Sequence, residues 1–191
     1  MVRFSIMNYI VIDTSTARTS CALFRDNELL FSDHRDGATE HAEALPKLVA
    51  AAFRINNQID QVIVGMGPGP FTGLRVGIAF GETFALARGI KVIGVCSLDG
   101  IDIDSDEYIV TTDARRKEIY WAKYKAGLRV EGPNVSKPEE IAVRSERKFG
   151  FGFTETLYPS PHLLLAKSKS FPISGALYLR RPDAVPTSER S

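Results

Sequence analysis

The sequence predicts an α/β fold made of two related halves, the second of them reduced. Short β-branched runs indicate strands, and two longer segments have the apolar spacing of helices. A strand–turn–strand pattern near the start recurs from Glu107 onward. The chain has 191 residues, enough for one large domain or two small ones with a core. We therefore expect an N-terminal lobe over residues 1–100 and a shorter C-terminal lobe over residues 101–191.

The first three elements are strands. Asn8–Asp13 is a β-branched run, Ser20–Phe24 follows after a polar turn, and Glu28–His34 follows after the tight turn "RDN". Strands joined by such short turns pair in antiparallel fashion, so these three form a meander.

Helices and buried strands then alternate. Apolar residues over 40–55 have helical spacing, although Pro46 interrupts or kinks that segment. Gln61–Gly65 and Lys91–Val95 are almost wholly apolar, as expected for strands that are covered on both faces. Thr72–Arg88 between them is the second helix.

This order of elements is that of the ribonuclease-H-like half found in actin, sugar kinases and Hsp70 ATPases, the ASKHA superfamily. A second half starts similarly with Glu107–Thr112 and Glu118–Tyr124, and a third strand is expected near Leu128–Val130. Short helices are expected at "KPEEI" and at Pro161–Ser168, and the tail "RRPDAVPTSERS" is expected to be solvated. Topology of this kind fixes a fold and not a function.

Composition narrows the class of protein. A net charge of +1 offers no basic field for nucleic acid, so a partner would supply most phosphate contacts if RNA is involved. Cys21 and Cys96 lie in apolar runs without CxxC spacing, which favours buried thiols in a reducing cytoplasm. No run reaches the roughly 20 apolar residues of a membrane-spanning helix. The start lacks a signal-peptide cleavage region, and either Met1 or Met7 is the natural first residue.

Glycine is concentrated between Val62 and Gly89, which hold seven of the chain's 15 glycines. A phosphate-binding function finds little support, because no lysine follows in Walker A spacing and Thr72 stands where a dinucleotide fingerprint needs its third glycine. The loop does run from a buried strand into a helix N-terminus, so a weak anion site stays open.

The spacing of these small residues is more informative. They recur every four positions, which places them along one face of a helix. Three glycines inside a helix cost about 3 kcal/mol relative to alanine, so a close neighbour must compensate. That neighbour is either part of the same fold or a helix of a second subunit, and the two are not exclusive. The residues of the stripe are Gly69, Gly73, Gly77, Gly81, Ala85 and Gly89.

The stretch "VGMGPGPFTGLRVGIAFGETFALARGIKVIGVCSLDGI" resembles the bacterial TsaB family, also called YeaZ. Further similarity lies in "YIVIDTSTARTSCALF", "DARRKEIYWAKY" and "LYLRRPDA", in the family's order. Pro70 departs from the family pattern, where serine is usual, and the region of about 130–170 matches weakly.

The resemblance implies a cytoplasmic, non-catalytic subunit in the synthesis of threonylcarbamoyladenosine beside the anticodon of tRNAs that read A-starting codons. In that family the paralogue TsaD transfers the threonylcarbamoyl group, and the ATPase TsaE joins the complex. The resemblance implies that this subunit contacts tRNA only as part of the complex. The resemblance implies no catalytic residue, cofactor or metal in this chain.

We expect the glycine face of the second helix, flanked by the 40–55 helix, to meet TsaD. Without TsaD the same surface is expected to pair with a second copy. The residues expected at this partner interface are His41, Leu45, Val49, Gly73, Gly77, Gly81 and Ala85.

The paralogue's metal site is expected to be missing. The two positions of its HxxxH motif fall on Ser97 and Ile101, and isoleucine cannot ligate a metal. The remaining histidines, His34, His41 and His162, have no mutual ligand spacing.

Two turns correspond to the phosphate-binding turns of actin-like ATPases. The first, Asp13–Thr16, has hydroxyl side chains where glycine is usual, which favours a structural turn over a nucleotide site. The second contains Asp113, Arg115 and Arg116, which are either solvated or in contact with a partner or a phosphate.

The sequence assigns no function to two aromatic and two basic positions. Trp121 and Tyr120 alternate on a strand, so one is expected to face the core and the other a groove. Arg180 and Arg181 are expected to be exposed.

The sequence leaves two alternative functions. An actin-like ATPase or kinase is disfavoured by the missing glycine in the first turn, and a metallopeptidase by the missing HxxxH. ATP hydrolysis and metal content of the chain alone would separate these alternatives from the subunit hypothesis.

Overall fold

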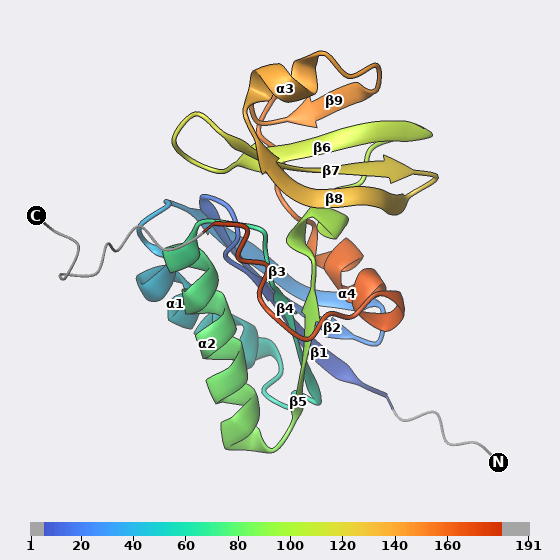
Figure 1. The fold of residues 1–191 in the computed structure, drawn as a ribbon. Helices are drawn as coiled ribbons and strands as arrows, with labels where there is room; N and C mark the ends of the chain where they lie inside the picture. The colour runs from blue at the N-terminus through green and yellow to red at the C-terminus, as the bar shows by residue number, and fades with distance from the viewer. Residues whose placement is uncertain (1–5, 181–191) are drawn as a thin grey trace, which may run out of the picture.

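The computed structural model describes residues 6–180 and contains two β-sheets stacked one above the other (Figure 1). The predicted Met1 start, Arg181 and the tail 181–191 lie outside the described residues. None of the helices within the described residues is long and apolar enough to cross a membrane.

The first sheet has five strands in the order β3-β2-β1-β4-β5. Its strands are β1 (Asn8–Asp13), β2 (Arg18–Arg25), β3 (Glu28–Asp36), β4 (Gln61–Gly65) and β5 (Lys91–Val95). The first three pair antiparallel, as predicted, whereas β4 pairs parallel with both β1 and β5.

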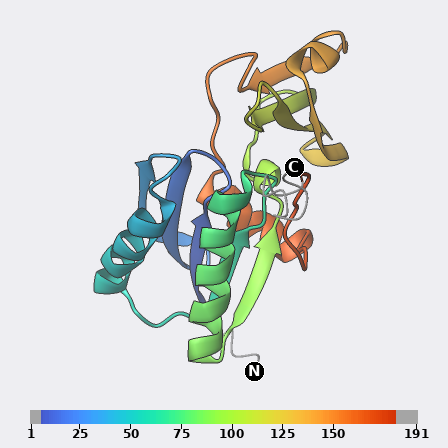
Figure 2. The same ribbon diagram turned by 60° about the vertical axis from the view of Figure 1, so that its left-hand side comes forward.

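Helices cover both faces of this sheet. On one face lie α1 (His41–Ile55), which runs through Pro46 without a break, and α2 (Phe71–Arg88). On the other face α4 (Pro161–Ser170) packs Leu164 and Leu165 against the sheet. Figure 2 shows α1 and α2 side by side in front of the sheet. Because helices cover both faces of the sheet, its central strand β4 is almost wholly apolar.

The second sheet begins after a short 3₁₀ helix, η1 (Ser97–Gly100), and has the strand order β8-β7-β6-β9. Strands β6, β7 and β8 form an antiparallel meander, a short helix follows, and β9 returns parallel to β6. This sequence of elements repeats β1 to β4, so the two halves are duplicated and the second is reduced, as predicted. The elements are β6 (Glu107–Asp113), β7 (Ile119–Lys125), β8 (Leu128–Ser136), α3 (Pro138–Ala142) and β9 (Arg147–Gly150).

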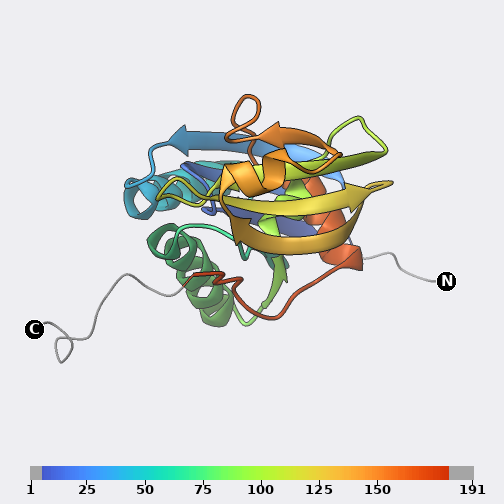
Figure 3. The ribbon, with the colours of Figure 1, turned by 45° about the horizontal axis from the view of Figure 1, so that its top comes forward.

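The C-terminal part of the chain differs from the expectation that residues 101–191 form one lobe. Helix α4 belongs to the first sheet, and the segment after it also returns there, because Ile173 N–H donates to Gly94 O at 2.9 Å and Leu177 N–H to Met66 O at 2.8 Å. Figure 3, which looks down on the second sheet, shows this C-terminal segment passing beneath it. The apolar residues of α4 that cover the sheet explain this return, since a sheet face must be covered.

Candidate functional site: the first turn, helix α2 and the interlobe cleft

The first turn is closed around a buried carboxylate. Asp13, which is 1% exposed, accepts hydrogen bonds from Ser15 N–H (2.9 Å), Ser15 Oγ (2.7 Å) and Ser97 Oγ (2.6 Å). Burial raises the pKa of Asp13, and the hydrogen bonds from Ser97 and Ser15 offset that effect only in part. With its oxygens engaged inside the fold, Asp13 ties the end of β1 to η1.

The glycine-rich loop lies directly on this turn. A Cβ atom added at Gly65 would clash with the Asp13 carboxylate, and one at Gly69 would clash with the Ser15 carbonyl. Glycine is needed at both positions because backbone approaches backbone and carboxylate there. The weak anion site at the N-terminus of α2 stays a prediction.

Helix α2 is joined to the same turn by the hydroxyl of Thr14. Thr14 Oγ1 donates to Gly73 O at 2.7 Å and accepts from Gly77 N–H at 3.2 Å. A Cβ at Gly73 would lie 2.9 Å from Thr14 O, a Cβ at Gly77 would clash with Thr14 Oγ1, and a Cβ at Gly81 would lie 2.6 Å from Val64 Cγ2. The glycine stripe therefore packs against the chain's own sheet, which is the first of the two neighbours left open by the sequence.

The residues expected at the partner interface are all buried within the first lobe: His41, Leu45, Val49, Gly73, Gly77, Gly81 and Ala85. The structure thus differs from the expectation of an exposed surface built from them, because the sheet already covers these side chains.

His41 is a buried core histidine. It is 4% exposed and shares a 2.7 Å hydrogen bond between its Nδ1 and Thr19 Oγ1. Burial, followed by the nearby charge of Arg115, lowers the pKa of His41, so the ring is neutral at physiological pH.

The outer face of α2 is mixed, because the exposed Ala79 and Leu86 lie there among the exposed polar residues Arg75, Glu82 and Thr83. Leu86 is 84% exposed, Ala79 is exposed, and Val76, Phe80 and Phe84 are half-buried. Val76, Phe80 and Phe84 pack against the apolar cluster of the first lobe, so the apolar surface that α2 leaves exposed in the isolated chain is mainly that of Ala79 and Leu86.

A cleft of about 130 Å³ lies between the lobes. It joins the first turn to the second turn, which follows β6. Asp113 Oδ1 accepts from Arg115 N–H at 2.7 Å, and the Arg115 guanidinium lies 3.0 Å from Asp113 Oδ2. The residues lining the cleft are Thr16, Ala17, Pro70, Thr112, Asp113, Arg115, Phe151, Thr156, Leu157 and Tyr158.

Ser97 and Ile101, the two positions that the resemblance aligns with a metal-binding HxxxH motif, are part of the core here. Ser97 donates to Asp13, and Ile101 packs in the second lobe's apolar cluster. Among the described residues, no group of three or more His, Cys, Asp or Glu side chains could hold a metal ion. His34 lies on β3, and His162 lies on α4 with its ring 4.8 Å from that of Phe24.

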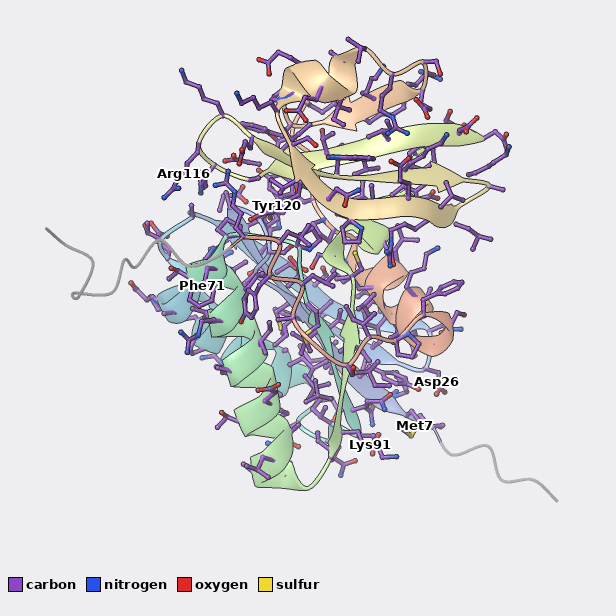
Figure 4. The ribbon with its side chains drawn as sticks, viewed as in Figure 1. Met7, Asp26, Phe71, Lys91, Arg116 and Tyr120 are labelled. Atoms are coloured by element: carbon purple, nitrogen blue, oxygen red, sulfur yellow. The ribbon has the colours of Figure 1, made fainter. Side chains whose placement is uncertain are left out.

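Tyr120 and Trp121 on β7 are both buried. Trp121 packs in a cluster with Ile109 and donates from Nε1 to Ser136 Oγ at 3.1 Å. Tyr120 faces the first lobe, where its hydroxyl donates to Gly69 O at 3.2 Å, so it links the lobes (Figure 4). The expectation that Arg180 is exposed is wrong, because Arg180 is half-buried in an ion pair with Glu118.

Sequence reasoning missed the aromatic wall of the cleft, formed by Phe151 and Tyr158, and the buried hydroxyl of Thr112. The wall lies in the weakly matched region 130–170, where no motif points to it. Thr112 immediately precedes Asp113, and the alternation of side chains along a strand was the available signal for its direction.

The chain is similar to proteins of known family and known structure. Residues 35–173 match the family model described as TsaD, tRNA N6-adenosine threonylcarbamoyltransferase. The solved structure of YeaZ from Pseudomonas aeruginosa superposes with a TM-score of 0.74 over 91% of this chain and 100% of that chain, at 22% identity, which concerns the fold.

Relatives in sequence cover most of the chain. An uncharacterized protein of Mycobacterium tuberculosis strain H37Rv is 39% identical over 97% of this chain and 98% of its own length. One from Mycobacterium leprae is 38% identical over 93% of this chain, which spans only 56% of that longer relative. The Escherichia coli tRNA threonylcarbamoyladenosine biosynthesis protein TsaB is 28% identical over 75% of this chain and 68% of its own length.

The duplicated lobes and the matched model define an actin-like α/β protein of the group to which the threonylcarbamoyltransferases belong. The first turn and the metal-ligand positions are here filled by structural contacts. Within that group the chain belongs to the TsaB (YeaZ) family.

Proposed function

We propose that this chain acts in the biosynthesis of threonylcarbamoyladenosine in tRNA, as a non-catalytic subunit that binds a catalytic paralogue of the TsaD kind. The relatives from Escherichia coli, Haemophilus influenzae and Bacillus subtilis that bear this function in their names support the process. The role of the chain within that process rests on its own residues.

The observation that carries the proposal is the outer face of α2. The inner face of this helix is occupied by the sheet, and its outer face exposes Ala79 and Leu86 among the polar residues Arg75, Glu82 and Thr83. Such a mixed surface favours contact with another protein. Figures 1 and 2 show α2 at the outside of the first lobe, where a partner has direct access. In the absence of the paralogue, a second copy of the chain would cover the same face through a two-fold pair.

The polar groups that a catalyst would use are committed to structural contacts. Asp13 accepts three hydrogen bonds, and His41 is hydrogen-bonded to Thr19. A general acid or base must reach a substrate proton. These contacts therefore support a subunit without a catalytic side chain.

Other members of the complex follow from the same proposal. A net charge of +1 supports tRNA contact through the complex rather than through this chain alone. We include the ATPase TsaE as a further partner and the cytoplasm as the place of action.

The test is reconstitution with the TsaD-type protein of the same organism, a TsaE-type ATPase, tRNA and threonylcarbamoyl-adenylate. We expect modified tRNA only when this chain is present, and neither ATP hydrolysis nor bound metal in the chain alone. Modification at the same rate without the chain, or ATP turnover by the chain alone, would contradict the proposal.

A further inference from the structure

The interlobe cleft has two kinds of wall. Pro70, Phe151, Leu157 and Tyr158 make most of its surface apolar. Polar groups converge at one side, from the first turn, from the end of β6 and from the second turn. An apolar hollow with a few convergent polar groups is the usual form of a small-molecule site.

Thr112 supplies an unmatched polar group in this wall. The residue is 4% exposed, and its Oγ1 has no hydrogen-bond partner among the residues that the structure describes. Its neighbour Thr111, by contrast, donates to the Phe151 carbonyl at 2.8 Å. A buried hydroxyl without a partner costs stability, so its presence beside a cleft indicates that something else binds it.

The charges in the cleft form a matched pair. The Asp113 carboxylate and the Arg115 guanidinium lie 3.0 Å apart, and both residues line the cleft. Arg115, Arg116 and Lys117 have φ angles of 62°, 52° and 62°, in the left-handed region that side chains rarely adopt. Figure 4, which labels Arg116 and Phe71, shows this turn above the N-terminal end of α2. Three such residues in a row are strained, and strain of this kind gathers at binding sites.

We propose that the cleft binds a small free α-amino acid, with its carboxylate at Arg115, its ammonium group at Asp113 and the hydroxyl of Thr112 as a third contact. An α-amino acid bears one charge of each sign on adjacent groups, which complements the side-by-side charges of the cleft. Its short side chain, as in valine or threonine, would lie against Phe151 and Leu157.

Size and charge disfavour the other ligand classes. A volume of 130 Å³ corresponds to about four water molecules and lies below the roughly 300–1,000 Å³ typical of cofactor sites, so a nucleotide is too large. A simple anion would meet the Asp113 carboxylate, and a simple cation would meet the Arg115 guanidinium. A zwitterion avoids both repulsions.

The first experiment is calorimetric titration of the purified chain with L-valine and with L-threonine. We expect saturable one-to-one binding with a dissociation constant of about 1 mM or below. N-acetyl-L-valine lacks the ammonium group and L-valinamide lacks the carboxylate, so each should bind at least about tenfold more weakly. Inorganic phosphate and AMP serve as competing probes and should not saturate the site.

Substitutions separate a ligand contact from a structural role. Thr112→Val should weaken binding about tenfold without lowering the melting temperature, because this hydroxyl has no bond within the protein to lose. Arg115→Gln should abolish binding, whereas Arg147→Gln, an exposed arginine of β9 outside the cleft, should leave it unchanged.

The proposal is overturned if wild-type chain of native circular dichroism binds neither amino acid, or if phosphate or AMP saturates the cleft instead. An unchanged affinity in Thr112→Val would also overturn it. Because these titrations use the chain alone, their failure is distinct from failure of the proposed subunit function, which concerns α2 and a partner.

Discussion

The inner face and the outer face of α2 have different kinds of neighbour. On the inner face Gly73, Gly77 and Gly81 bring the helix onto Thr14 and the sheet, so closely that added Cβ atoms would clash or crowd there. On the outer face Ala79 and Leu86 point away from the lobe. The difference teaches that a small-residue stripe marks close packing and does not say with what. The partner surface we propose is the exposed side opposite the stripe, which contains Ala79 and Leu86.

The largest expected effect on stability comes from the inner face. Gly77→Leu would force a side chain into Thr14. Overpacking typically costs about 1–3 kcal/mol and here falls at the upper end or beyond, whereas the gain in helix propensity is only about 1 kcal/mol. We expect a net loss of about 2–3 kcal/mol in the free energy of unfolding, measured by urea denaturation. Ala79→Leu on the outer face is the matched control and should unfold as wild type does. Equal stability of the two variants would show that the inner face of α2 is no more closely packed than the outer face.

A smaller loss is expected when the bridge between the first turn and α2 is removed. Thr14→Val lacks the hydroxyl that donates to Gly73 O and accepts from Gly77 N–H, and should lose about 1–2 kcal/mol of stability. Thr14→Ser restores the hydroxyl and should recover most of the loss. If serine rescues nothing, methyl packing and not hydrogen bonding joins the turn to the helix.

The buried carboxylate of Asp13 should make the free energy of unfolding depend on pH. Because burial raises the pKa of Asp13 in the folded chain, its favourable contribution is fully present below the unfolded pKa. That contribution is lost as the pH rises through the raised folded value. Asp13→Asn should therefore show a smaller fall in stability than wild type as the pH rises from about 4, in urea titrations at several pH values. Identical pH profiles would mean that Asp13 is ionised at no cost.

Periodicity predicted most of the first lobe. The alternating runs of β1, β2 and β4 and the helical spacing of α1 and α2 gave elements whose ends agree with the structure to within a few residues. The signal was strong because these elements are covered on one or both faces, so their apolar pattern follows geometry directly.

The remaining features depend on contacts between distant residues. Helix α4 packs on the first sheet because Leu164 and Leu165 contact β4 and β5. Those strands lie more than 60 residues earlier in the sequence, so a local pattern could not predict the contact. The cleft unites Thr16 with Asp113 and Tyr158 from separate segments. The burial of the stripe was underdetermined because glycines every four residues suit a sheet or a foreign helix equally well.

If the outer face of α2 binds the catalytic paralogue, Ala79→Glu should disrupt the complex. Ala79 is exposed, so the substitution should change the stability of the isolated chain by less than about 0.5 kcal/mol. A buried, unpaired carboxylate in an interface should still weaken association at least about tenfold. Ala166→Glu, an exposed alanine of α4 on the opposite face of the sheet, is the control.

The measurement is sedimentation velocity of each variant mixed with the TsaD-type protein, beside urea denaturation of the variant alone. We expect that Ala79→Glu is folded but fails to form the complex, whereas Ala166→Glu forms it as wild type does. Complex formation by Ala79→Glu at wild-type affinity would contradict the claim.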